Sequence, residues 1–194
     1  IDLPVGTDVH SDQVYEKAVK NFDALKRDAP LVIEEVPSAY VYRLRMGGHS
    51  ETGVAACYSI AEYESDVIKK HEYTRRDKED DRTRHMLDLR AQTGPVFLTY
   101  RASSTVDAIV ERATSSRPLF DFEAVDGVQH TIWQIQPDAL AELEPAFRAI
   151  PALYIADGHH GAASAARVAR QLRQASGTGE WDTFLGVAFP HNQV

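Results

Sequence analysis

The stretch that decides the fold is residues 153–170, LYIADGHHGAASAARVAR. Its first part, residues 153–156, is a short apolar run typical of a buried strand, and Asp157-Gly158 is a pair typical of a sharp turn. The alanine-rich part that follows predicts a helix lying close against its neighbours. A strand, a turn and a helix in this order leave backbone N–H groups unpaired at the helix start, where the helix dipole favours an anion.

Three chemically active side chains stand at this junction: Asp157, His159 and His160. Asp157 is a candidate to accept a metal ion or a proton, and a histidine can donate to a phosphate or shuttle a proton near neutral pH. The alternative is that Asp157 only caps the helix and that both histidines are ordinary surface residues. Because two adjacent histidines follow a buried strand, we favour a functional site.

Composition places the chain among soluble globular proteins. Hydrophobic residues make up 43% and charged residues 26% of the 194 residues, a length that one large domain or two small ones can fill. We expect a single domain over residues 1–194. The formal net charge of −8 argues against general nucleic-acid binding and against an anionic membrane surface. It leaves room for a local basic pocket that binds a phosphorylated small molecule.

Cys57 is the only cysteine, which excludes an intrachain disulfide and fits a reducing, cytoplasmic location. It lies in the apolar, strand-like run 54–60, which predicts a core position. No stretch approaches the roughly 18 apolar residues of a membrane span, and no signal-peptide pattern is present. The chain begins at Ile1 and ends just after the apolar run 184–189. We therefore expect a fragment of a longer domain that extends at both ends.

Elsewhere, periodicity predicts alternating helices and strands. The first helix spans residues 12–26 and has an apolar stripe of Val14, Ala18, Phe22 and Leu25. Residues 47–50, GGHS, turn a strand over 40–46 into a strand over 52–60, which predicts a hairpin. Further helices are predicted over 105–113 and 140–150, and further strands over 95–100, 128–135 and 184–189. Without a strict strand–helix–strand repeat, this order predicts an α+β or mixed α/β fold.

Residues 69–85 are the densest polar stretch. Thr74, with Asp77 three residues later, resembles a capping box and predicts a helix from Arg75. Helical spacing then aligns four residues on one stripe, namely Lys78, Arg82, His85 and Leu89.

Because Leu89 is apolar, we expect Arg82 and His85 to face inward. His71 and Glu72 precede this helix, where they can face a ligand. The alternative is a solvated helix carrying ion pairs between successive turns. A zinc-protease motif is absent, since no second histidine follows His71-Glu72 at the required spacing, and with one cysteine we do not expect a structural zinc site.

These motifs together resemble a prokaryotic family known as domain of unknown function ten-fifteen. The resemblance rests on residues 70–74 (KHEYT), 78–82 (KEDDR), 92–95 (QTGP) and 154–160 (YIADGHH), and it covers nearly the whole chain.

The Asp-Gly-His-His motif also resembles the nucleotide-binding motif of the ParB/sulfiredoxin-like superfamily, which includes free serine kinases. This resemblance implies a core of mixed sheet with packed helices, a nucleotide (ATP or ADP) and Mg²⁺. In those relatives an arginine usually follows the two histidines, whereas this chain has Gly161. The missing charge would then have to come from Arg82, Arg75 or Arg167.

We therefore predict a nucleotide-dependent phosphotransferase that acts on a small hydroxyl substrate such as free serine. Glu72, Asp157, His159 and His160 are the predicted catalytic residues, with Asp157 also as metal ligand. Ligand-binding roles are predicted for His71, Thr74, Arg75, Arg82, His85, Gly158 and Gly161. The alternatives are a non-catalytic nucleotide-binding regulatory module and a phosphoester hydrolase. A nucleotide and a small-molecule substrate are the expected partners, without nucleic acid or membrane, and a homo-oligomer is compatible with the sequence.

Overall fold

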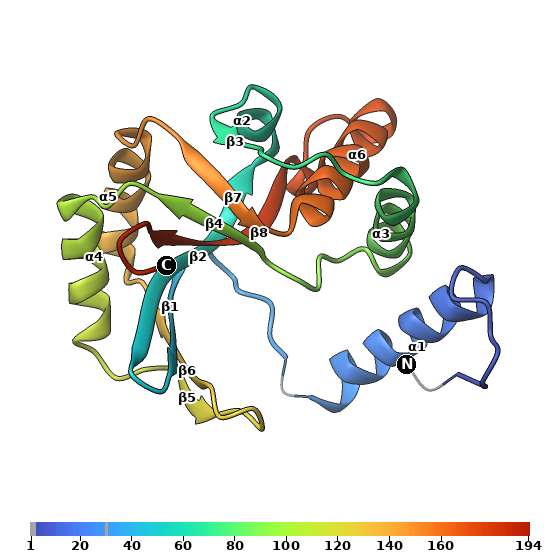
Figure 1. Ribbon diagram of the computed structural model, residues 1–194, viewed down its shortest axis with the longest axis horizontal. Coiled ribbons are helices and arrows are strands. Elements are labelled where there is room, and N and C mark those ends of the chain that lie inside the picture. The colour runs from blue at the N-terminus through green and yellow to red at the C-terminus, as the bar shows by residue number, and fades with distance from the viewer. Residues whose placement is uncertain (1–2, 30) are drawn as a thin grey trace.

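The computed structural model describes residues 3–29 and 31–194, and these residues form six helices and one eight-stranded sheet (Figure 1). The helices are α1 (Asp12–Asp28), α2 (Ile60–Glu64), α3 (Arg76–Leu89), α4 (Ser104–Thr114), α5 (Pro137–Arg148) and α6 (His159–Ser176). The strands are β1 (Tyr40–Met46), β2 (His49–Ser59), β3 (Ile68–Lys69), β4 (Val96–Tyr100), β5 (Phe120–Glu123), β6 (Gln129–Gln134), β7 (Leu153–Asp157) and β8 (Thr183–Pro190). A short 3₁₀ helix, η1 (Glu180–Asp182), precedes β8.

The sheet is mixed. Its strand order is β3-β7-β4-β8-β2-β1-β6-β5. β4 runs parallel to β8 and β3 parallel to β7, whereas every other neighbouring pair is antiparallel. A mixed sheet with helices packed on it agrees with the α+β fold that the sequence predicts. None of the described helices is long and apolar enough to cross a membrane.

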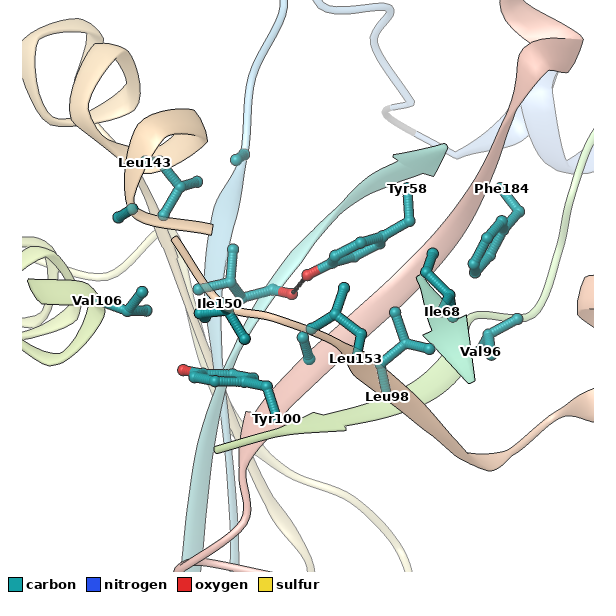
Figure 2. Packing of buried hydrophobic residues seen from close by; sticks show 14 of the residues in the cluster. Tyr58, Ile68, Val96, Leu98, Tyr100, Val106, Leu143, Ile150, Leu153 and Phe184 are labelled. Carbon is teal, nitrogen blue, oxygen red and sulfur yellow. Dashed lines mark hydrogen bonds between the residues drawn. The ribbon is translucent and has the colours of Figure 1, made fainter. Parts of the chain in front are cut away.

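The main core lies between one face of the sheet and helices α4, α5 and α6. Alternate residues of a strand share a face, so Val96, Leu98 and Tyr100 of β4 all point into this core. Tyr100 packs against Phe147 of α5 with ring centroids 5.4 Å apart, and the cluster continues to Val106 and Leu143 (Figure 2). The opposite end of the same face is covered by α6.

Helix α6 is buried on several sides because its side chains are small. Its five buried alanines contact the sheet or the neighbouring helices, and Ser164 is also fully buried. Small side chains let a helix approach its neighbours closely, and α3 packs along α6. The prediction of a tightly packed alanine-rich helix is confirmed.

The predicted hairpin is also confirmed. β1 and β2 pair from Met46↔His49 to Tyr40↔Ala55 around a two-residue turn, Gly47-Gly48, in which Gly47 has a positive φ of 58°. The second strand ends one residue earlier than predicted. The side chain of Ser59 accepts a hydrogen bond from the backbone of Glu62 and so caps α2.

The prediction that Cys57 belongs to the core is wrong, because Cys57 is exposed. β1 pairs with β2 only as far as Ala55, so the later part of β2 has a strand neighbour on the β8 side alone. An apolar, strand-like sequence does not reveal that one neighbouring strand ends before it.

The predicted capping box of α3 is wrong as well. The helix begins at Arg76, one residue later than predicted, and Arg75 is its N-cap without a side-chain hydrogen bond. Thr74 donates its hydroxyl to the Glu79 carboxylate at 2.9 Å, and Asp77 pairs with the Arg75 guanidinium at 2.8 Å. Both predicted capping side chains are therefore bound elsewhere.

The packing corrects the predicted inward-facing stripes of two helices. In α3 the buried residues are Thr83 and Leu89, while Arg82 is exposed. In α1 the buried residues are Tyr15 and Ala18, and Leu25 remains 51% exposed. Helix α1 makes its main contact with α3.

Candidate functional site

The turn between β7 and α6 is built around Gly158. This residue has φ +92°, and a Cβ at this position would lie 3.3 Å from the Cα of Val96. Both the backbone angle and the nearby strand therefore require glycine. Gly158 is the N-cap of α6, and the helix has neither a side-chain cap nor an acidic residue in its first turn. Asp157 is the last residue of β7, so the interpretation of Asp157 as a helix cap is wrong.

The structure brings the two predicted motifs together. Nδ1 of His159 lies 3.5 Å from Oε2 of Glu72, and the ring of His159 meets that of His71 edge to face, with centroids 4.4 Å apart. The backbone N–H of Arg75 donates to Nε2 of His160 at 3.2 Å. We call these five residues the histidine site: His71, Glu72, Arg75, His159 and His160. The motif before α3 therefore packs against the motif that begins α6.

His159 is the buried member of this site. It is only 4% exposed, and its Nε2 atom has no hydrogen-bond partner among the described residues. Burial lowers the pKa of His159 below its ordinary value of 6.5, and the neighbouring His71 lowers it further, although Glu72 opposes the shift. Near neutral pH the ring is therefore uncharged. The nearby Glu72 carboxylate favours the proton on Nδ1 of this ring.

His71, Glu72 and Arg75 are exposed and His160 is partly buried. The side chain of Glu72 is 61% exposed, which leaves its carboxylate free to meet a molecule from solution. Nε2 of His160 accepts the hydrogen bond from Arg75, so a neutral His160 carries its proton on Nδ1. The site thus offers a ligand the Glu72 carboxylate as an acceptor, Nδ1–H of His160 as a donor, and the first N–H groups of α6.

Glu79 organises the contact between α3 and α6, a role that the sequence analysis missed. Its carboxylate accepts from Thr74 at 2.9 Å and pairs with Arg167 at 3.2 Å. Its backbone oxygen accepts from the buried Ser164 hydroxyl at 3.2 Å. Arg167 also pairs with Asp80 at 2.5 Å. The only sequence signal was a serine and an arginine within an alanine-rich helix.

The remaining predicted ligand-binding residues lie around this site in different ways. Arg75 and Arg167 are held by carboxylates, as described above. Arg82 is exposed and His85 is partly buried, and no hydrogen bond or ion pair of the described residues joins either one to the histidine site. Gly161 lies in the first turn of α6, where an added Cβ would meet Cγ2 of Val96 at an ordinary 3.8 Å.

The predicted metal role of Asp157 rests on one carboxylate. Among the residues that the structure describes, no group of three or more histidine, cysteine, aspartate or glutamate side chains is placed to hold a metal ion. Mg²⁺ in phosphate-binding sites is usually held by one or two carboxylates together with substrate phosphates. The exposed Asp157 beside the start of α6 fits this arrangement, and its role stays a prediction.

A comparison with protein families gives one match. The model of a family described as a protein of unknown function matches residues 1–194. Neither the curated proteins nor the solved structures contain a match to the chain. The resemblance to the ParB/sulfiredoxin-like superfamily accordingly stays a prediction.

Proposed function

The chain belongs to the family of proteins of unknown function DUF1015, and we propose that it is a nucleotide-dependent phosphotransferase acting on a small hydroxyl substrate such as free serine. The observation that carries the proposal is the contact between Glu72 and His159 at the start of α6. It places an accessible carboxylate beside a helix N-terminus that has no side-chain cap. Phosphoryl transfer needs these two elements, an anion site and a group that takes the hydroxyl proton.

Phosphate binding is the first role of the site. The N–H groups of residues 159–161 are the first of α6, and they point along the helix axis away from the helix body. Nδ1–H of His160 adds a side-chain donor at the same end. Together they would bind the terminal phosphate oxygens of a nucleotide. Mg²⁺ held by Asp157 and those phosphates would neutralise part of the charge.

Proton removal is the second role. In the proposed reaction the acceptor hydroxyl oxygen attacks the terminal phosphorus, and the bond from that phosphorus to its bridging oxygen breaks. The hydroxyl proton passes to the carboxylate of Glu72, which is exposed enough to be reached. His159 is enclosed, so it acts by holding the Glu72 carboxylate in place.

A non-catalytic nucleotide-binding module is the second candidate, and one observation favours it. Gly161 stands where an arginine is usual in the proposed relatives, and Arg167 is held by Glu79 and Asp80. Without a free cation at the terminal phosphate, binding would persist while transfer would be slow.

The two candidates are separated by one pair of measurements. The melting temperature of the chain is measured with ATP or ADP, each with and without Mg²⁺, and phosphoserine is then quantified after incubation with ATP, Mg²⁺ and serine. The phosphotransferase raises the melting temperature and forms phosphoserine. The binding module raises the melting temperature alone. If neither nucleotide raises it at millimolar concentration, both candidates are wrong.

A further inference from the structure

A second region of the molecule can hold a small molecule. It lies beside β2, beyond the end of its pairing with β1. The pairing of β1 with β2 begins at Tyr40↔Ala55, so residues 36–39, which precede β1, are not paired with β2. Between them opens a cavity of about 1190 Å³ that α5 covers. None of its lining residues belongs to the histidine site. We call this space the α5 cavity.

The interior of the α5 cavity is apolar. Aliphatic and aromatic side chains from the sheet and from α5 line it, including Val54, Ala56, Leu140, Leu143, Phe147 and Ile150. Tyr58 also lines it, but its hydroxyl donates to the backbone oxygen of Val54 at 2.9 Å. Because that hydroxyl is already satisfied, Tyr58 offers its ring to the cavity. Cavities that bind small molecules are mostly of this apolar kind and usually measure about 300–1,000 Å³.

The charged residues that line the cavity carry an excess of one negative charge. They are Glu62, Glu144 and Arg148. Arg148 pairs with Glu144 at 2.7 Å, whereas Glu62 makes no ion pair with any described residue. The free charge beside the apolar interior is therefore the carboxylate of Glu62, which would attract a cation and repel an anion.

We propose that the α5 cavity binds a small amphiphilic molecule with an apolar body and a protonated amine. The body would occupy the space between α5 and the sheet, and the amine would lie beside Glu62. This binding is independent of the phosphotransferase proposed for the histidine site. The volume provides most of the affinity through burial of apolar surface, and the carboxylate provides the preference among head groups.

Cys57 makes this proposal directly measurable. It is the only cysteine of the chain, it is exposed, and it lines the α5 cavity. The rate at which Ellman's reagent modifies Cys57 therefore reports on access to the cavity. A molecule that occupies the cavity slows this reaction in a saturable way.

The experiment compares three probes of equal chain length, dodecylamine, dodecanol and dodecanoate, each below its micelle concentration. Dodecylamine is expected to protect Cys57 at the lowest concentration, with a preference over dodecanol of roughly threefold, as for an exposed ion pair. Glu62→Gln should abolish that preference while dodecanol still protects. Equal protection by all three probes, or a preference for dodecanoate, would overturn the assignment of an amine.

Two alanine variants, one in α5 and one at its C-cap, test the location. Ala141 is exposed and lines the cavity, so Ala141→Trp should fill part of the space and weaken protection by dodecylamine at least tenfold. Ala149 is also exposed but is not a lining residue, so Ala149→Trp is the matched control and should leave protection unchanged. Failure of every probe to protect Cys57 in the folded wild-type chain, or equal effects of the two variants, would overturn the proposal.

Discussion

The histidine site and the α5 cavity differ in the kind of ligand group that each can bind. The histidine site has donors, an acceptor and a helix N-terminus, all crowded into contact, with His159 only 4% exposed. The α5 cavity has about 1190 Å³ of space and an apolar lining with one unpaired carboxylate. One region can recognise charge at a point, and the other can hold an apolar body. In many binding sites, convergent polar side chains line the cavity itself. In this fold the convergent polar side chains and the cavity lie in two separate regions.

The largest expected effect is on phosphate transfer. Glu72→Gln removes the proposed proton acceptor while keeping its size, so the turnover number should fall by roughly 10²–10⁴-fold. Because Glu72 is 61% exposed, the melting temperature should change little. Glu16→Gln is the control, since Glu16 is an exposed residue of α1. Both variants are assayed for phosphoserine formation, and equal turnover in the two would exclude Glu72 as the base.

The next effect is on nucleotide affinity. Gly161→Arg supplies a cation near the start of α6, and a charge-assisted hydrogen bond to phosphate is worth roughly 1.5–3 kcal/mol, or about tenfold or more in affinity. The substitution should be tolerated, since Gly161 is helical and an added Cβ meets Val96 at 3.8 Å. Calorimetric titration with ATP measures the change, and the melting temperature is the folding control. A folded variant that binds ATP no better than wild type contradicts a phosphate-clamping role for this position.

A smaller effect is expected on the free energy of unfolding, and it should differ between Gly158 and Gly161. Gly158→Ala places a Cβ at φ +92° and 3.3 Å from the backbone of Val96, which should cost about 1–3 kcal/mol of unfolding free energy. Gly161→Ala, the matched control, should gain up to about 1 kcal/mol, because alanine is the better helix former. Urea denaturation measures both. If the two substitutions shift the midpoint in the same direction, the account of this turn is wrong.

The smallest effect is a pH dependence. The pKa of His159 is lowered in the folded chain, so the unfolded chain binds more protons as the pH falls below about 6.5. The free energy of unfolding should therefore decrease from pH 7 to pH 5. His159→Gln should make this decrease shallower. Identical slopes for wild type and His159→Gln over this range would show that His159 does not titrate as proposed.

Much of the fold could be predicted because its signals are local. The Gly47-Gly48 turn fixes the β1–β2 hairpin, and the sequence of residues 153–170 fixes β7, its turn and α6. The elements that were missed depend on tertiary contacts. β3 has two residues that pair in parallel with β7, and β5 is a four-residue edge strand with every residue exposed.

The histidine site and the α5 cavity also differ in how far the sequence predicts them. The histidine site could be predicted because its side chains come from two short motifs, although the role of Glu79 depends on how α3 packs on α6. The α5 cavity gave no signal in the sequence. It is lined by residues from several separate segments. It opens where the pairing of β1 with β2 ends at Tyr40↔Ala55.

The most direct test of the central claim is a nucleotide titration followed through the histidine rings. The claim is that the segments before α3 and at the start of α6 form one phosphate-binding site. The ring nitrogen resonances of ¹⁵N-labelled protein are recorded while ATP and Mg²⁺ are added. The account predicts saturable shifts for His71, His159 and His160, with a common dissociation constant, and none for His49 or His130 in the β1–β2 and β6 region. Saturable ATP binding that shifts His49 or His130 and leaves the three site histidines unchanged would contradict it.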